Sequence, residues 1–205
     1  MTDELPHLFE SNRAWAARRV ADDPHFFERL VAIQAPAYLW IGCADSRVPA
    51  NEIVGLDPGE LFVHRNVANL VARDDGNVLA VLQYAVDVLK VRHVVVTGHY
   101  GCGGVQAALG PPAGNPLERW LQPLRAVAAR HAQELAALPD DPARWHRLCE
   151  LNVVAQVQTL RTLPAVLGAW ARRQRLDLHG WIYDLHDGLL HDLHVTIDGP
   201  TTPAR

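Results

Sequence analysis

The hydrophobic pattern of the chain alternates between short apolar runs and longer stretches with helical spacing. The apolar runs at residues 38–43, 60–64 and 93–98 are nearly unbroken, which is typical of strands buried on both faces of a parallel sheet. Residues 77–90 carry apolar side chains at helical intervals. Strand, helix and strand in this order predict a βαβ unit with a right-handed crossover. We therefore expect an α/β fold with a mainly parallel central sheet flanked by helices.

Helical periodicity also dominates both sides of this unit. Residues 8–34 predict two amphipathic helices that are separated at Asp23-Pro24 and cover another surface. Residues 116–137 predict a long helical region, and a helix pair follows through Ala171.

The end of the chain returns to a strand pattern. Apolar residues alternate with other residues over 178–184 and again over 190–197, around the turn Asp187-Gly188. This predicts two closing strands, arranged as a hairpin at the edge of the sheet. No repeat or linker interrupts the chain, so we expect a single domain over residues 1–205.

Composition narrows the class of protein. The 205 residues are 49% hydrophobic and 20% charged, which excludes a disordered chain. A net charge of −4 argues against a partner such as nucleic acid or an anionic membrane, which clustered Lys and Arg would bind. Three cysteines are too few for a disulfide scaffold. With an acidic start and no stretch apolar enough to span a bilayer, we expect a cytoplasmic protein with a small-molecule partner.

Two short segments carry residues suited to chemistry. Cys43-Ala44-Asp45-Ser46-Arg47 follows the first predicted strand, and the glycine-rich segment 98–104 follows the third. Residues just past the carboxyl ends of parallel strands face the same crevice. We therefore expect a convergence of the side chains of Cys43, Asp45, Arg47, His99 and Cys102.

This set permits several interpretations. Two Cys and one His with an open fourth position form a catalytic zinc site. Taken singly, residues such as Cys43 and His99 are more often ordinary buried residues than metal ligands. The glycine loop could cradle phosphate, although it matches neither the dinucleotide fingerprint nor a P-loop. Cys43 could also be a thiol nucleophile activated by His99, which leaves Cys102 without a role.

The motifs resemble those of the β-class carbonic anhydrases of bacteria over most of the chain. The resemblance rests on a C-x-D-x-R segment followed by H-x-x-C-G-G, within residues 41–49 and 98–104, and on residues 59–69 and 179–183. Ala44 stands where many relatives carry Ser. The family fold is an α/β domain whose N-terminal helices reach across to a partner subunit.

The resemblance implies a set of site residues. It implies one Zn²⁺ per subunit bound by Cys43, His99 and Cys102, with Asp45 and Arg47 as the neighbouring dyad. It also implies self-association as a dimer or tetramer, with a substrate pocket at the dimer interface that includes Gln34, Phe62, Val67, Tyr84 and Gly103.

The expected reaction is the reversible hydration of CO₂ to bicarbonate and a proton, by attack of zinc-bound hydroxide. While Arg47 holds Asp45, the carboxylate would accept a hydrogen bond from that hydroxide. Once released from Arg47, the carboxylate would compete with hydroxide for the fourth zinc position. Because lower pH removes hydroxide first, this competition would switch the activity with pH. Some bacterial members also hold inhibitory bicarbonate in a non-catalytic pocket, whose residues match Trp40, Arg65 and Tyr183. The alternative is that Trp40 belongs to the core and Arg65 forms a salt bridge in the dimer.

Two other functions remain open at this point. A related fold could keep the metal and serve as a bicarbonate-binding or carboxylate-binding module. A metal-free transferase could instead use Cys43 as a thiol nucleophile. Cys149 is expected to be a packing residue. Four histidines near the end suggest a second metal site, but histidine is ordinary on the solvent-exposed face of an edge strand, which is the expectation here: His179, His186, His191 and His194.

Overall fold

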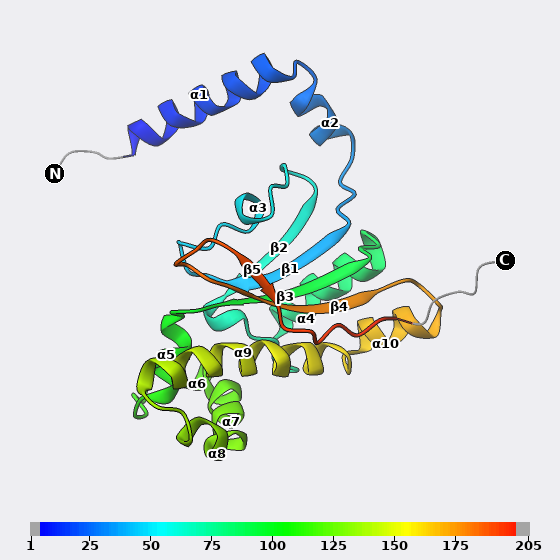
Figure 1. Ribbon diagram of the computed structural model, residues 1–205. Helices are drawn as coiled ribbons and strands as arrows, with labels where there is room; N and C mark the ends of the chain where they lie inside the picture. The colour runs from blue at the N-terminus through cyan, green and yellow to red at the C-terminus, as the bar shows by residue number, and fades with distance from the viewer. Residues whose placement is uncertain (1–4, 200–205) are drawn as a thin grey trace. The chain divides into compact units, whose positions relative to one another are not determined.

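The computed structural model describes residues 5–199, which fall into two units that meet between residues 35 and 36 (Figure 1). The first unit holds the two predicted helices, α1 (Pro6–Asp22) and α2 (Phe26–Ala32). Trp15 of α1 packs edge-on against Phe27 of α2, with ring centroids 5.8 Å apart. The single domain expected over residues 1–205 stays a prediction.

The second unit is built on a five-stranded sheet in the order β2-β1-β3-β4-β5. The first four strands are parallel, and β5 runs antiparallel to β4 as the predicted edge hairpin. Five of the six residues of β1 are buried, as are six of the seven residues of β3, which explains their unbroken apolar runs. The strands are β1 (Tyr38–Cys43), β2 (Leu61–Asn66), β3 (His93–His99), β4 (Asp177–Tyr183) and β5 (Leu190–Asp192).

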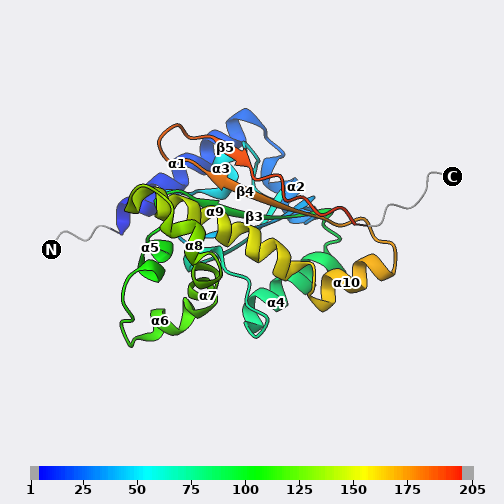
Figure 2. The ribbon, with the colours of Figure 1, turned by 60° about the horizontal axis from the view of Figure 1, so that its bottom comes forward.

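Helices cover one face of the sheet, and the longest of them lies directly on β3 and β4 (Figures 1 and 2). This helix, α9 (Asp141–Leu160), is capped by Asp140, whose carboxylate accepts a hydrogen bond from the Ala143 N–H at 2.8 Å. It approaches closely because Gly98 leaves room: a Cβ there would lie 2.6 Å from Val153. On the same side of the sheet lie α4 (Gly76–Gln83), α5 (Gly103–Leu109) and α10 (Pro164–Ala171).

The elements differ in detail from the predicted ones at three places. Strand β2 continues to Asn66, two residues past the predicted end. The helical stretch from residue 77 changes after α4 into a π-helical turn, η2 (Tyr84–Val88). The long helical region is three short helices, because Pro123 starts a new helix and the chain turns again at His131: α6 (Pro116–Trp120), α7 (Gln122–Arg130) and α8 (Ala132–Ala136).

The opposite face of the sheet carries a row of aromatic rings that includes Tyr38, His93, His179 and Trp181. The short helix α3 (Ala50–Ile53) precedes a loop that reaches this face and helps to line a pocket of about 190 Å³ beside Trp40. Among the helices between residues 5 and 199, none combines the length and hydropathy that a membrane crossing needs.

Candidate metal centre

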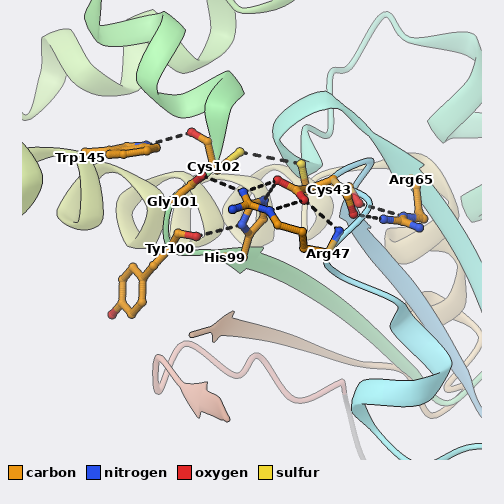
Figure 3. Close-up of polar contacts among 9 residues, drawn as sticks. Cys43, Arg47, Arg65, His99, Tyr100, Gly101, Cys102 and Trp145 are labelled. Atoms are coloured by element: carbon orange, nitrogen blue, oxygen red, sulfur yellow. Dashed lines mark hydrogen bonds and ion pairs between the residues drawn. The ribbon is translucent and has the colours of Figure 1, made fainter. Parts of the chain in front are cut away.

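Three metal-binding side chains converge at the carboxyl ends of the parallel strands. Cys43 is the last residue of β1, His99 is the last residue of β3, and Cys102 directly precedes α5 (Figure 3). Their ligand atoms all lie within 4.8 Å of one another, and all three side chains are buried. The register that pairs β1 with β3 thus brings together residues nearly 60 positions apart, as the sequence predicts.

The geometry of the three donors fits a tetrahedral ion of the size of zinc. The two sulfur atoms are 3.8 Å apart, and two Zn–S bonds of about 2.3 Å at a tetrahedral angle require about 3.8 Å. His99 Nδ1 donates to the carbonyl oxygen of Tyr100 at 2.9 Å, which leaves the Nε2 lone pair free to bind a metal. This Nε2 atom is buried and has no hydrogen-bond partner among the described residues.

The two thiols do not both ionise easily by themselves. The hydrogen bond with Cys102 lowers the pKa of Cys43, and His99 and the main-chain N–H of Ala68 act in the same direction against the effect of burial. The pKa of Cys102 is raised by the same hydrogen bond with Cys43, by burial and by the charge of Cys43. One negative charge therefore forms readily, and the second needs a cation beside it.

Asp45 lies at the edge of the donor group, where Arg47 holds it. The main-chain N–H and the Nε of Arg47 donate to Oδ1 at 3.0 and 2.9 Å, and Nη2 donates to Oδ2 at 2.7 Å. These bonds hold the pKa of Asp45 far below its usual range, so the carboxylate is ionised. Its Oδ2 lies 3.8 Å from His99 Nε2. The five residues that the sequence singles out therefore do lie together.

The residues expected in the substrate pocket are only partly related to this centre. Phe62 and Tyr84 contact each other, with ring centroids 5.9 Å apart. Val67 lies against α5, because a Cβ on Gly104 would come within 2.8 Å of it. Gly103 begins α5 directly after Cys102, and Gln34 belongs to the first unit of the chain. The substrate pocket therefore stays a prediction.

The residues expected to bind inhibitory bicarbonate come from three strands of the sheet. Arg65 uses Nε to donate to the carbonyl oxygen of Cys43 at 2.8 Å, and it uses Nη2 to donate to that of Asp45. Trp40 is buried and packs edge-on against Trp181, with centroids 6.5 Å apart. Tyr183 pairs with His99 at the end of β4. Arg65 thus braces the main chain of the 43–45 segment, and an anion there would have to share its donors.

Sequence reasoning missed the residues that brace the loops of the centre. Trp145 donates from Nε1 to the carbonyl oxygen of Cys102 at 2.8 Å (Figure 3). The side chains of Asn152 and Gln156 are buried in α9 and reach the turn that follows β2. The only signal for this pair was two amides spaced by four residues within an otherwise apolar stretch of helix.

Fold and donor group together define an α/β protein with a buried Cys₂His group that could hold a metal ion. Comparison with known proteins names the class: a family model described as carbonic anhydrase matches residues 38–190. The carbonic anhydrase of Emericella nidulans is 50% identical over 192 residues, which cover 94% of this chain and 84% of that protein.

Solved structures agree with this match. A structure from a study of two tetrameric β-carbonic anhydrases of the filamentous ascomycete Sordaria macrospora has a TM-score of 0.90 and 43% identity, covering 93% of this chain and 97% of its own. The Coccomyxa β-carbonic anhydrase in complex with acetazolamide has a TM-score of 0.92 and 42% identity, covering 97% and 90%. The chain therefore belongs to the β-carbonic anhydrase family, whose enzymes are lyases of the carbonate dehydratase type. Since the similar proteins include those of an ascomycete, they do not single out the bacterial members.

His64 is linked to the turn that follows β2 through the side chain of Asn66. His64 is buried on β2, and its Nε2 lies 3.2 Å from the amide nitrogen of Asn66. That nitrogen donates, because Asn66 Oδ1 accepts from the Leu70 N–H at 2.7 Å, so the neutral imidazole is the form that fits. Burial lowers the pKa of His64, and the charge of Asp75 partly opposes this effect.

We predict that acidification lowers the free energy of unfolding in part through His64. Below pH 6.5, the ordinary pKa of His64, the unfolded chain binds a proton that the folded chain resists. This contribution is therefore complete above that pH and is lost as the pH falls toward the lower pKa of the folded state. Urea unfolding at pH 7.5 and 5.5 should show a smaller loss of stability in His64→Gln than in the wild type. An equal loss in both proteins would contradict this assignment.

Proposed function

We propose that this protein catalyses the reversible hydration of CO₂ to bicarbonate and a proton, with zinc bound by Cys43, His99 and Cys102. The observation that carries the proposal is the buried donor group itself, in which His99 Nε2 has no protein partner within the described residues and faces two sulfur atoms. Asp45 lies beside this group and is fixed by Arg47, which a purely structural metal site would not need.

Zinc held there would act as a Lewis acid that acidifies a bound water. The water would be less acidic than at a zinc ion with three neutral ligands, because two thiolates offset the charge of the ion. The chain's own residues supply orientation. Arg47 keeps the Asp45 carboxylate ionised and in place. The carboxylate can then accept a hydrogen bond from the attacking water, which leaves a lone pair of the water oxygen directed at CO₂. The bond from His99 Nδ1 to the carbonyl oxygen of Tyr100 fixes the orientation of the ring, so that Nε2 is the nitrogen that faces the sulfur atoms.

Metal content and CO₂ hydration, measured on the same preparations, test the proposed function. The wild type should hold one zinc per chain and hydrate CO₂ in stopped-flow assays, whereas Cys102→Ala should lose both. Cys149→Ala is the matched control, because Cys149 is also buried, burial raises its pKa to about 12, and it lies outside the donor group. It should keep its zinc and its activity.

The outcomes of this experiment separate the alternatives. Bound zinc without hydration would favour a bicarbonate-binding or carboxylate-binding module. Activity without metal, abolished by alkylation of Cys43, would favour a thiol-dependent transferase. Equal effects of the two cysteine substitutions would contradict the assignment of Cys102 as a ligand.

We further propose that bicarbonate inhibits the enzyme at Trp40, Arg65 and Tyr183, and that Asp45 competes for the metal at lower pH. Support comes from Arg65, whose guanidinium donates to the carbonyl oxygens of Cys43 and Asp45. An anion that draws these donors away would loosen the segment that carries Asp45. Release from Arg47 would then let the Asp45 carboxylate take the open metal position, where hydroxide outcompetes it only at higher pH.

The bicarbonate proposal predicts a specific change in inhibition. Wild-type hydration activity should rise between pH 7 and 8.5, and added bicarbonate should inhibit it most at the lower pH. Arg65→Ala should weaken that inhibition relative to its own uninhibited rate, since the anion loses its charged partner. A flat pH profile would contradict the competition by Asp45, and unchanged inhibition in the variant would contradict the bicarbonate site.

We also propose that the chain self-associates as a dimer or tetramer. Several apolar side chains in both units are exposed, including Val31 at 88%, Ile33 at 67% and Val88 at 60%. The similar Sordaria macrospora enzymes are described as tetrameric. Sedimentation at micromolar concentration should therefore show a dimer or tetramer, and a monomer would contradict the proposal. A cytoplasmic location stays a prediction, and one Arabidopsis thaliana relative is named as mitochondrial.

A further inference from the structure

The turn that follows β2 has an unusual conformation beside the donor group. Ala68 and Asn69, in the short helical turn η1 (Val67–Asn69), both have positive φ angles, of 66° and 48°. Residues other than glycine rarely adopt this left-handed backbone conformation. Ala68 is also completely buried. A residue other than glycine holds such a conformation only where its surroundings enforce it.

The turn packs against β1, which ends at Cys43, and against α5, which follows Cys102. A Cβ on Gly104, in the first turn of α5, would lie 3.0 Å from the Ala68 Cβ and 3.5 Å from the nitrogen of Ala68. The Ala68 carbonyl oxygen accepts a hydrogen bond from Asn152 Nδ2 of α9 at 2.8 Å. The neighbouring Val67 carbonyl oxygen accepts from Trp120 Nε1, also at 2.8 Å. The turn is thus held from outside by side chains of the helical layer.

Two buried amides in α9 form a chain of hydrogen bonds in a defined direction. The N–H of Val71 donates to Gln156 Oε1, and Gln156 Nε2 donates to Asn152 Oδ1, each at 2.8 Å. Because the Gln156 oxygen is fixed by an N–H donor, its NH₂ must face Asn152. The NH₂ of Asn152 must then face Ala68. Gln156 therefore sets which way round the Asn152 amide lies.

The helix that carries these amides is itself firmly placed. Asn152 and Gln156 are 0% and 3% exposed, so neither can exchange its partners for solvent. Val153 and Val157, on the same stretch of α9, pack where Gly98 and Gly180 leave room on β3 and β4. A movement of the Ala68 peptide would therefore leave buried amide groups unpaired, which is costly.

We propose that Asn152 and Gln156 are positioning residues for the metal centre, which act by locking the Ala68 peptide in its left-handed conformation. The locked peptide holds the turn against β1, which ends at Cys43, and holds Val67 against α5, which follows Cys102. This proposal deepens the proposed function, because it assumes that Cys43 binds zinc. Neither amide touches the donor atoms, so the effect passes through Ala68.

The test measures the first-order rate at which each zinc-loaded protein transfers its metal to a colorimetric chelator. Asn152→Ala should release zinc at least about tenfold faster than the wild type, the range typical of residues that orient metal ligands. Adding Ala68→Gly should return the rate to within about threefold of the wild type, since glycine adopts a positive φ without the steric cost. If Asn152→Ala does not fold, Gln156→Leu with the same second substitution serves in its place.

Val157→Ala is the matched control for a general loss of stability. Val157 is equally buried on α9 and does not contact the turn after β2 through any hydrogen bond, so this variant should lose unfolding stability and still release zinc at the wild-type rate. Three results would overturn the proposal: wild-type release in Asn152→Ala, no rescue by Ala68→Gly, or release from Val157→Ala that is as fast as from Asn152→Ala.

A wild type that binds no zinc would contradict the proposed function and the metal-positioning part of this inference. The locking of the Ala68 peptide by Asn152 and Gln156 would then be tested on the same variants by the rate at which an alkylating reagent modifies Cys43. Asn152→Ala should speed this modification, because Cys43 is only 6% exposed and a loosened turn would uncover it, and adding Ala68→Gly should restore the wild-type rate. Equal rates in all variants would overturn the positioning role.

Discussion

The structure depends on the burial of three metal-binding donors against one another. The buried Nε2 of His99 has no hydrogen-bond partner among the described residues, which is costly unless a cation sits between it and the two sulfur atoms, 3.8 Å apart. The parallel register of β1 and β3 forces this meeting, because both strands end at the same edge of the sheet. The sheet and its helices can therefore be understood as the scaffold that keeps these donors in place.

The surroundings of the centre differ from one side to the other. On the side of α9, hydrogen bonds from Trp145 and Asn152 fix main-chain carbonyl groups of the loops that carry or contact the sulfur atoms. On the other side, Asp45 and Arg47 place a charged carboxylate at the edge of the group. Loops fixed by hydrogen bonds and a charged carboxylate at the edge of the group suit the proposed hydration, since one water must be oriented while CO₂ enters.

Much of the fold could be predicted from the sequence for a simple reason. Strands buried on both faces leave continuous apolar runs, so β1 and β3 were recognisable, and the Asp187-Gly188 turn marked the closing hairpin. The donor group followed from its position after these strands. The breaks near Pro123 and His131 were not predicted, because helical periodicity continues across short changes of direction.

The missed features are those that depend on distant contacts. Ala68 gives no sign in the sequence of its left-handed conformation, which glycine would have signalled. Asn152 acts on Ala68, 84 residues earlier in the chain, and only the folded structure brings them together. The position of Gln34 relative to the centre is likewise a matter of how units or subunits assemble, which no local pattern encodes.

X-ray absorption at the zinc edge, on protein purified without added chelator, tests the central claim most directly. The account predicts a first shell of two sulfur atoms at about 2.3 Å and two lighter atoms at about 2.0 to 2.1 Å, one of them with the outer scattering of an imidazole ring. A shell without sulfur, or with sulfur alone, would contradict the assignment of Cys43, His99 and Cys102 as the metal centre.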